Sequence, residues 1–418
     1  MSNSPVWHPF HQHGLGEAIP LVERAEGAML FTSDGREVVD AISSWWVTTH
    51  GHNHPRIVKA IRAQAEQLDQ LIFAGWTHRP AEDLARGLTA IMPRELEHVF
   101  FSDSGSTAVE VALKMALGYW TNIGSPRHRI VVMEHSYHGD TIGAMSVGER
   151  GVFNKAYSPL LFAVKTVPFP AAGAERATLD ALETACRAGD VAAFIVEPLV
   201  LGAGGMLVYS PDVLCEMRDI CARHDVLFIA DEVMTGWGRT GTLLACEQAG
   251  VVPDILCLAK GLTGGSMPLA VTLATAPIYD AHYSTDRSKM FFHSSSFTAN
   301  PIACAAANAN LAIWREEPVM ERVADLSNRV GEGMQSLVDR HGLVNFRQCG
   351  TVVAADVPAE DAGYLAELGP AMRDGFYARD ILLRPLGNTL YLMTPYCITD
   401  AQLGRVFSAM NEVLSEIS

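Results

Sequence analysis

The stretch from residue 228 to residue 261 decides the fold. It opens with Phe228-Ile229-Ala230-Asp231-Glu232-Val233 and closes with Ile255-Leu256-Cys257-Leu258-Ala259-Lys260-Gly261. In each half, a short apolar run ends at one ionisable side chain, Asp231 in the first and Lys260 in the second. Short apolar runs of this kind are typical of buried strands in a parallel sheet. Because ligands of open α/β sheets bind at the carboxyl ends of the strands, we expect both side chains to face a ligand there.

Around this stretch, the middle of the chain alternates between strand-like and helix-like segments. Helical patterns at 107–119 and 211–224 lie between short apolar runs. This alternation predicts an α/β layer with a mainly parallel central sheet. The predicted strands are residues 98–101, 129–133, 192–196, 227–230, 255–258 and 269–274.

The two ends of the chain carry a different pattern. Residues 30–43 predict a hairpin around the turn Ser33-Asp34-Gly35-Arg36. Further along, amphipathic helices are predicted at 318–341 and 400–417, with strand-like segments at 351–357 and 389–393. We therefore expect a large domain over residues 51–309 and a smaller α+β domain built from residues 1–50 and 310–418.

Composition argues against several classes of protein. The chain has 418 residues, 49% of them hydrophobic, and a formal net charge of -16. An acidic balance is unlike that of nucleic-acid-binding proteins. The most apolar stretch, 191–207, is interrupted by Glu197 and Pro198, so we expect no membrane span. We expect no secretory signal and no metal site, and the eight cysteines without CxxC spacing suit reduced thiols in the cytoplasm.

Lys260 is a candidate for covalent chemistry. A lysine that forms a Schiff base needs a fixed position and a lowered amine pKa. Among the six lysines, Lys260 stands at the end of an apolar run and before the glycine-rich loop Gly261-Leu262-Thr263-Gly264-Gly265. On this local pattern alone, a surface lysine at a strand exit is equally consistent.

Asp231 offers a matching negative charge. A carboxylate at a strand end can keep a pyridinium nitrogen protonated, so that the ring acts as an electron sink. Val233 would then pack against one face of the ring, and Tyr137, after the strand at 129–133, could stack on it. The alternative is a helix-capping aspartate beside a core valine. His138, next to Tyr137, receives no catalytic role.

The segment Ser102-Asp103-Ser104-Gly105-Ser106 joins a predicted strand to a predicted helix. Free N–H groups at the start of a helix bind phosphate well. Gly105 would let the backbone approach, and Ser106 would add a hydroxyl. Thr107 and Glu110 have the spacing of a capping box, so simple capping is the alternative interpretation.

Taken together, these residues resemble the class III aminotransferases over essentially the full length of the chain. The Asp231 and Lys260 pair marks the class. The Ser-Trp-Trp stretch and the Arg-Pro and Tyr-Leu-Met stretches are similar to those of class members that act on 8-amino-7-oxononanoate. The resemblance is carried by Trp7-His8-Pro9, Ser43-Ser44-Trp45-Trp46, Asp103-Ser104-Gly105-Ser106, Tyr137-His138-Gly139-Asp140, Glu197-Pro198, Asp231-Glu232-Val233, Gly238-Arg239-Thr240-Gly241, Cys257-Leu258-Ala259-Lys260, Asn300-Pro301-Ile302-Ala303-Cys304, Arg384-Pro385 and Tyr391-Leu392-Met393.

The resemblance implies the fold type I architecture of transferases that depend on pyridoxal 5′-phosphate (PLP), with a homodimer that shares two active sites. It implies that Lys260 carries PLP as a Schiff base and that Asp231 pairs with the pyridine nitrogen. The other expected contacts to the ring and the phosphate are Gly105, Ser106, Tyr137, Val233 and, from the partner subunit, Ser296.

The reaction implied by the resemblance is a ping-pong transamination of 8-amino-7-oxononanoate to 7,8-diaminononanoate in biotin biosynthesis. The expected amino donor is S-adenosylmethionine. Phe10 replaces the tyrosine usual in this family, which leaves lysine or another amine open as the donor. The alternatives are a broad ω-aminotransferase, an aminomutase or racemase on the same scaffold, and a regulatory protein that binds the cofactor. The residues expected to contact substrate are Phe10, Trp45, Trp46, Tyr137, Arg384 and Tyr391, the last two at its carboxylate end.

Overall fold

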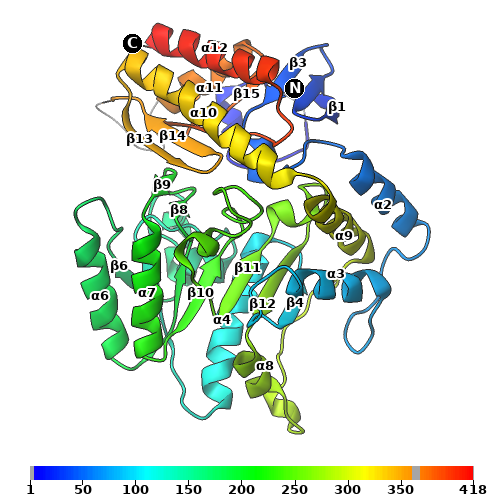
Figure 1. Cartoon of the computed structure of the whole chain (residues 1–418), viewed down its shortest axis with the longest axis vertical. Coiled ribbons are helices and arrows are strands. Elements are labelled where there is room, and N and C mark those ends of the chain that lie inside the picture. The colour runs from blue at the N-terminus through cyan, green and yellow to red at the C-terminus, as the bar shows by residue number, and fades with distance from the viewer. Residues whose placement is uncertain (1–3, 360–367, 418) are drawn as a thin grey trace.

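A sheet of seven strands forms the centre of the molecule (Figure 1). The computed structural model describes residues 4–359 and 368–417. All strands of this sheet are parallel except β12, which runs antiparallel to both neighbours. The expected, mainly parallel sheet is therefore confirmed. In spatial order the strands are β4 (His98–Ser102), β12 (Ala270–Ala274), β11 (Ile255–Leu258), β10 (Leu227–Asp231), β7 (Val191–Val196), β5 (Arg129–Met133) and β6 (Lys165–Val167).

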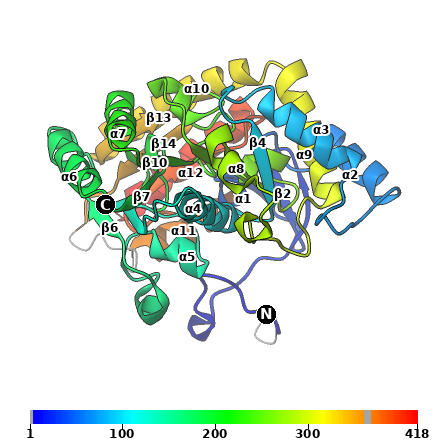
Figure 2. The same cartoon turned by 90° about the horizontal axis from the view of Figure 1, so that it is seen from below.

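Helices cover both faces of this sheet, because its strands alternate apolar side chains between two cores. On β7, Ile195 belongs to the core shared with α4 (Gly105–Asn122), and Phe194 belongs to the core shared with α6 (Glu175–Arg187) and α7 (Pro211–Arg223). Figure 2 shows α4 on one side of the strands and α6 and α7 on the other. Burial on both faces is the reason that these strands appear in the sequence as continuous apolar runs.

Segments from both ends of the chain build two smaller sheets at the top of Figure 1. The hairpin expected near residues 30–43 is confirmed, and its second strand pairs in parallel with a strand from the C-terminal part of the chain. One sheet is β1 (Val22–Glu26), β2 (Met29–Thr32), β3 (Glu37–Asp40) and β15 (Ile381–Leu382), and the other is β13 (Val344–Cys349), β14 (Val352–Asp356) and β16 (Thr389–Leu392).

Three helices pack with these smaller sheets: α10 (Val319–His341), α11 (Leu368–Ala378) and α12 (Asp400–Ile417). The domain limits at residues 50/51 and 309/310 stay a prediction, and α9 (Pro301–Glu316) runs through residue 309. Within the described ranges, every helix is too short or too polar to cross a lipid bilayer. The other elements are α1 (Ser43–Trp46), α2 (Pro55–Ala65), α3 (Arg79–Thr89), α5 (Ile142–Ser146), α8 (Ala276–His282), β8 (Val200–Leu201) and β9 (Leu207–Val208).

Candidate active site

A cavity of about 500 Å³ opens at the carboxyl ends of the central strands. Asp231 ends β10, and Lys260 follows the neighbouring parallel strand β11, so the sheet itself brings the two side chains to one place. The structure therefore gathers in one cavity eight of the residues singled out from the sequence. They are Trp45, Trp46, Gly105, Ser106, Tyr137, Val233, Asp231 and Lys260.

Lys260 presents its amine to this cavity from a strained backbone position. Its φ of 45° lies in the left-handed region, at the start of the short 3-10 turn Lys260–Thr263. The Nζ atom lies 4.8 Å from the centroid of the Trp46 ring. Burial lowers the pKa of Lys260 to about 8, although the nearby Asp231 and Glu197 carboxylates act in the opposite direction. The lowered pKa increases the fraction of unprotonated amine near neutral pH, the form that acts as a nucleophile or base.

Asp231 is held by a buried histidine. Its Oδ2 atom lies 2.7 Å from His138 Nδ1, and its Oδ1 atom accepts a hydrogen bond of 3.1 Å from Val233 N. The His138 side chain is fully buried, and its Nε2 has no partner within the part of the chain that the structure describes. His138 is thus a site residue that the sequence analysis left without a role. The only signal for it was its place next to Tyr137.

Glu197 is a second residue that the sequence analysis left without a role. It follows β7, which pairs in parallel with β10, and its side chain lines the cavity. The carboxylate accepts hydrogen bonds from Tyr137 N at 2.9 Å and Gly202 N at 3.0 Å. Burial raises the pKa of Glu197 to about 7; Asp231 adds to this rise and His138 opposes it. Its position after a central strand was the available signal, and it is the same signal that identified Asp231.

The start of α4 forms another wall of the cavity. The capping box expected at Thr107 and Glu110 is wrong, because Ser104 caps the helix: its Oγ accepts from Thr107 N at 3.2 Å, and Thr107 Oγ accepts from Ser104 N at 2.9 Å. Gly105 and Ser106 border the cavity, and their N–H groups precede the first intrahelical bond, from Ala108 N to Ser104 O. A Cβ atom on Gly105 would lie 2.6 Å from Val233 Cγ1, so only glycine fits there.

Phe10 and Arg384 border a second cavity, of about 490 Å³, further from Lys260. Arg384 donates from Nη2 to Phe10 O at 3.1 Å, and its guanidinium carbon lies 5.6 Å from the centroid of the Trp45 ring. The Phe10 ring is 5.4 Å from the same indole, centroid to centroid. Trp45 lines the first cavity, and its ring lies beside two residues that border the second.

Tyr391 and Ser296 lie outside both cavities. Tyr391, on β16, is 2% exposed, and its hydroxyl accepts a hydrogen bond of 3.0 Å from Trp46 Nε1. It therefore supports Trp46 from behind the cavity wall. Ser296 is exposed, and its carbonyl oxygen accepts from the Gln70 side chain. The roles expected for Tyr391 and Ser296 stay predictions.

The family model for aminotransferase class III matches residues 12–414. The chain belongs to the class III aminotransferases. The adenosylmethionine-8-amino-7-oxononanoate aminotransferase of Synechococcus elongatus is 46% identical to it over 424 residues, with both chains covered completely.

Two solved structures share the fold of this aminotransferase. The adenosylmethionine-8-amino-7-oxononanoate aminotransferase of Methanocaldococcus jannaschii has a TM-score of 0.95 at 32% identity and covers 99% of this chain and 97% of its own. An amine transaminase from an uncultivated Pseudomonas species, in its PLP-bound form, has a TM-score of 0.94 at 33% identity, with 100% and 99% covered. The expected fold of PLP-dependent transferases is thereby confirmed.

The raised pKa of Glu197 predicts a measurable effect of pH on the free energy of unfolding. The folded protein holds the proton up to a pKa of about 7, whereas the unfolded chain loses it near 4.5, so stability falls as pH rises between these values. Between these pH values, the free energy of unfolding of Glu197→Gln should fall by up to about 3 kcal/mol less than that of the wild type. Denaturant unfolding of the cofactor-free protein at pH 5 and pH 8 measures it. Glu66→Gln, at an exposed helix end, is the control, and parallel pH profiles for wild type and Glu197→Gln would contradict the prediction.

Proposed function

We propose that this enzyme uses PLP to transfer an amino group to 8-amino-7-oxononanoate, giving 7,8-diaminononanoate for biotin biosynthesis, with S-adenosylmethionine as the donor. The observation that carries the proposal is the line of side chains from Lys260 to Arg384. Trp46 lies against the reactive amine, Trp45 follows it, and the Arg384 guanidinium lies beyond Trp45. Such a line fits an acceptor that has a carbonyl carbon at one end, an apolar chain in the middle and a carboxylate at the other.

The chemistry of the side chains around the first cavity fits PLP. Lys260 supplies an amine of lowered pKa, and Asp231 supplies a carboxylate. At the start of α4, Gly105 and Ser106 supply N–H groups suited to a phosphate. A Cβ atom on Gly139 would clash with Ser106 Oγ, so the backbone at Gly139 lies directly against Ser106, at the proposed phosphate position. Tyr137 and Val233 would contact the ring from their places on the cavity wall.

When bound, PLP would supply an electron sink for the negative charge that develops on the substrate carbon. The residues of this chain would perform the remaining tasks. Lys260 Nζ would remove the proton from the carbon that bears the amino group and return it in the reverse direction. Asp231 would hold a proton on the pyridine nitrogen, and its bond to His138 keeps the carboxylate oriented. Trp46 would keep water away from the amine.

Arg384 is suited to the carboxylate end of the acceptor. Among the described residues, no acidic side chain forms an ion pair with it; it contacts Phe10 O and the Trp45 ring instead. A guanidinium whose charge is not neutralised can bind a carboxylate through two parallel hydrogen bonds. The alternative role for Arg384 is an ion pair that joins the terminal segments to the core, and its contacts with Phe10 O and the Trp45 ring favour the substrate role.

A broad amine transaminase is the second candidate, because the Pseudomonas amine transaminase is as similar in fold and identity as the Methanocaldococcus enzyme. The fold therefore does not separate the two activities. The Synechococcus enzyme, at 46% identity over the full length, favours the acceptor proposed above. Amino donors assayed one at a time, with either 8-amino-7-oxononanoate or pyruvate as acceptor, decide between them.

The first test concerns the attachment of the cofactor. We expect borohydride reduction of the holoenzyme, followed by peptide mapping, to place the label on Lys260. Lys260→Ala should lose nearly all turnover, because no other amine of the described residues lines the cavity. Lys114→Ala is the matched control, since Lys114 is exposed and bonds to Phe292 O. A label on any other lysine would overturn the assignment.

The second test concerns the acceptor. We expect Arg384→Ala to lower kcat/KM for 8-amino-7-oxononanoate about 10- to 150-fold, because a charge-assisted hydrogen bond contributes about 1.5–3 kcal/mol. An uncharged ketone should be much less affected. Arg373→Ala is the control: Arg373 borders the same outer cavity, but its charge is paired with Glu17 and Asp374. Equal losses on both acceptors would mean that Arg384 is structural.

We propose in addition a cytoplasmic homodimer with shared active sites. Ser296 lies outside its own cavity on an exposed segment, beside Phe297, which is 60% exposed, and near Phe292, which is 63% exposed. Apolar surface of this kind is typical of protein–protein contacts. All eight cysteines are unpaired, as suits a reducing compartment.

The third test uses mixed dimers of Lys260→Ala and Ser296→Trp. If Ser296 acts on the partner's site, each mixed dimer keeps one intact site, and half of randomly formed dimers are mixed. We therefore expect recovery of about a quarter of wild-type activity. Activity no higher than the mean of the two parent variants would show that Ser296 does not act across the interface.

A further inference from the structure

The two cavity tryptophans lie on a left-handed turn. Four consecutive residues without a glycine have positive φ: 52° at Ser43, 48° at Ser44, 81° at Trp45 and 72° at Trp46. Trp46 N donates to Ile42 O at 2.8 Å and Val47 N donates to Ser43 O at 2.9 Å, so the segment labelled α1 is one turn of left-handed helix. L-residues with a Cβ atom disfavour this conformation, and runs of it are rare. Contacts from elsewhere in the fold must therefore hold the turn in place.

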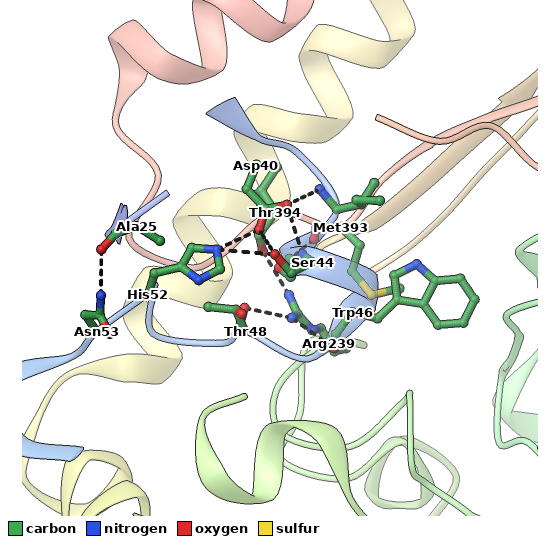
Figure 3. Close-up of polar contacts among 12 residues, drawn as sticks. Ala25, Asp40, Ser44, Trp46, Thr48, His52, Asn53, Arg239, Met393 and Thr394 are labelled. Atoms are coloured by element: carbon green, nitrogen blue, oxygen red, sulfur yellow. Dashed lines mark hydrogen bonds and ion pairs between the residues drawn. The ribbon is translucent and has the colours of Figure 1, made fainter. Parts of the chain in front are cut away.

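Asp40, the last residue of β3, holds the beginning of the turn (Figure 3). Its side chain is fully buried. Oδ1 accepts from Ile42 N at 3.2 Å and from Ser44 N at 2.9 Å, while Oδ2 accepts from Ser44 Oγ at 2.8 Å and lies 2.9 Å from His52 Nε2. Hydrogen bonds to a charged acceptor are stronger than those between neutral groups, so Asp40 fixes the backbone at the beginning of the turn.

Arg239 holds the end of the same turn. It is 1% exposed and comes from the loop after β10. It donates to Trp46 O at 3.4 Å, to Thr48 O at 3.1 Å and to Thr394 O at 2.8 Å (Figure 3). Among residues 4–359 and 368–417 no carboxylate forms an ion pair with this guanidinium; Asp40 favours its charge only through space, and its Nε has no hydrogen-bond partner there. Burial removes the water around a charged group, which is costly unless other polar groups replace it. For the Arg239 guanidinium, the three carbonyl oxygens replace part of that water.

The turn sets where both indoles point. Ser43 Oγ donates to Met393 O at 2.7 Å, and Trp46 Nε1 donates to the hydroxyl of Tyr391, so β16 and the residue after it support the turn from behind. With the turn held this way, Trp46 lies over Lys260, and Trp45 lies beside Phe10 and Arg384. In a right-handed or extended segment the same side chains would leave the backbone in other directions.

We infer that Asp40 and Arg239 are positioning residues that hold the left-handed turn Ser43–Trp46 and thereby set the shape of the acceptor site. The effect on the acceptor rests on the proposed function, whereas the control of the turn does not. Neither residue lines the cavity, and both act through the tryptophans.

The test compares glycine with alanine at position 44 in the Asp40→Asn background. Both substitutions remove the Ser44 hydroxyl, but only glycine adopts positive φ without steric cost. For Asp40→Asn we expect KM for the acceptor to rise about tenfold or more, with a smaller change in kcat, because Trp45 is displaced. Adding Ser44→Gly should recover much of this loss, and adding Ser44→Ala should not.

Two readouts on the holoenzyme need no substrate. The near-ultraviolet circular dichroism of the tryptophans should change in Asp40→Asn and return towards wild type with Ser44→Gly. The midpoint of the pH titration of the lysine-bound PLP absorbance should rise by about half a unit or more, because a displaced Trp46 admits water to the amine. If wild type fails to use 8-amino-7-oxononanoate, the proposed function fails, while these readouts still test the turn.

Two results would overturn the inference: wild-type KM and spectra in Asp40→Asn, or equal behaviour of the glycine and alanine variants in that background. If Asp40→Asn does not fold, the single variants decide. Ser44→Gly should then show a higher Tm than Ser44→Ala, and equal Tm values would overturn the inference. Arg239→Lys provides a second approach, because a lysine cannot reach three carbonyl oxygens as the guanidinium does.

Discussion

The burial of the Lys260 amine, which has no ion-pair partner among the described residues, is the constraint on which this site depends. Loss of hydration lowers the pKa of Lys260 to about 8, and the negative charges of Asp231 and Glu197 keep it from falling further. The same cavity raises the pKa of Glu197 to about 7. The site thus holds two ionisable groups whose pKa values lie close to neutral pH.

The central sheet and the terminal segments contribute different parts of this site. The sheet supplies the ionisable groups, because Asp231, Lys260 and Glu197 each end or follow one of its central strands. The terminal segments supply the wall that covers them, through Trp45 and Trp46. Arg239 connects the two parts, since it leaves the loop after β10 and donates to carbonyl oxygens of the terminal segments. A change in how these parts pack would therefore alter both the polarity around the amine and the space for a substrate.

Much of the fold could be predicted from local pattern. The apolar runs at 129–133 and 255–258 agree residue for residue with β5 and β11, and the helix at 400–417 agrees with α12. These predictions are correct because strands buried on both faces appear as continuous apolar runs, and amphipathic helices show apolar residues at helical spacing. The three-residue strand β6 (Lys165–Val167) was missed, because its pairing with β5 rather than its own composition makes it a strand. The cap of α4 was misplaced for a related reason: Ser104 and Thr107 bond to each other, whereas Glu110 accepts from Gly143 N.

The sequence by itself determined that Asp231 and Lys260 meet at one edge of a parallel sheet, because strand direction and strand ends are local properties and the geometry of a parallel sheet does the rest. Only the tertiary structure decided what surrounds them. His138 lies behind Asp231, and the left-handed turn directs Trp46 over Lys260. Nothing in the sequence Ser-Ser-Trp-Trp predicts positive φ, since L-residues disfavour it. Hydrogen bonds hold that conformation from two sides: Asp40 lies just before the turn and bonds to Ser44 N, whereas Arg239 lies 193 residues beyond Trp46 and is brought to its carbonyl oxygen only by the fold.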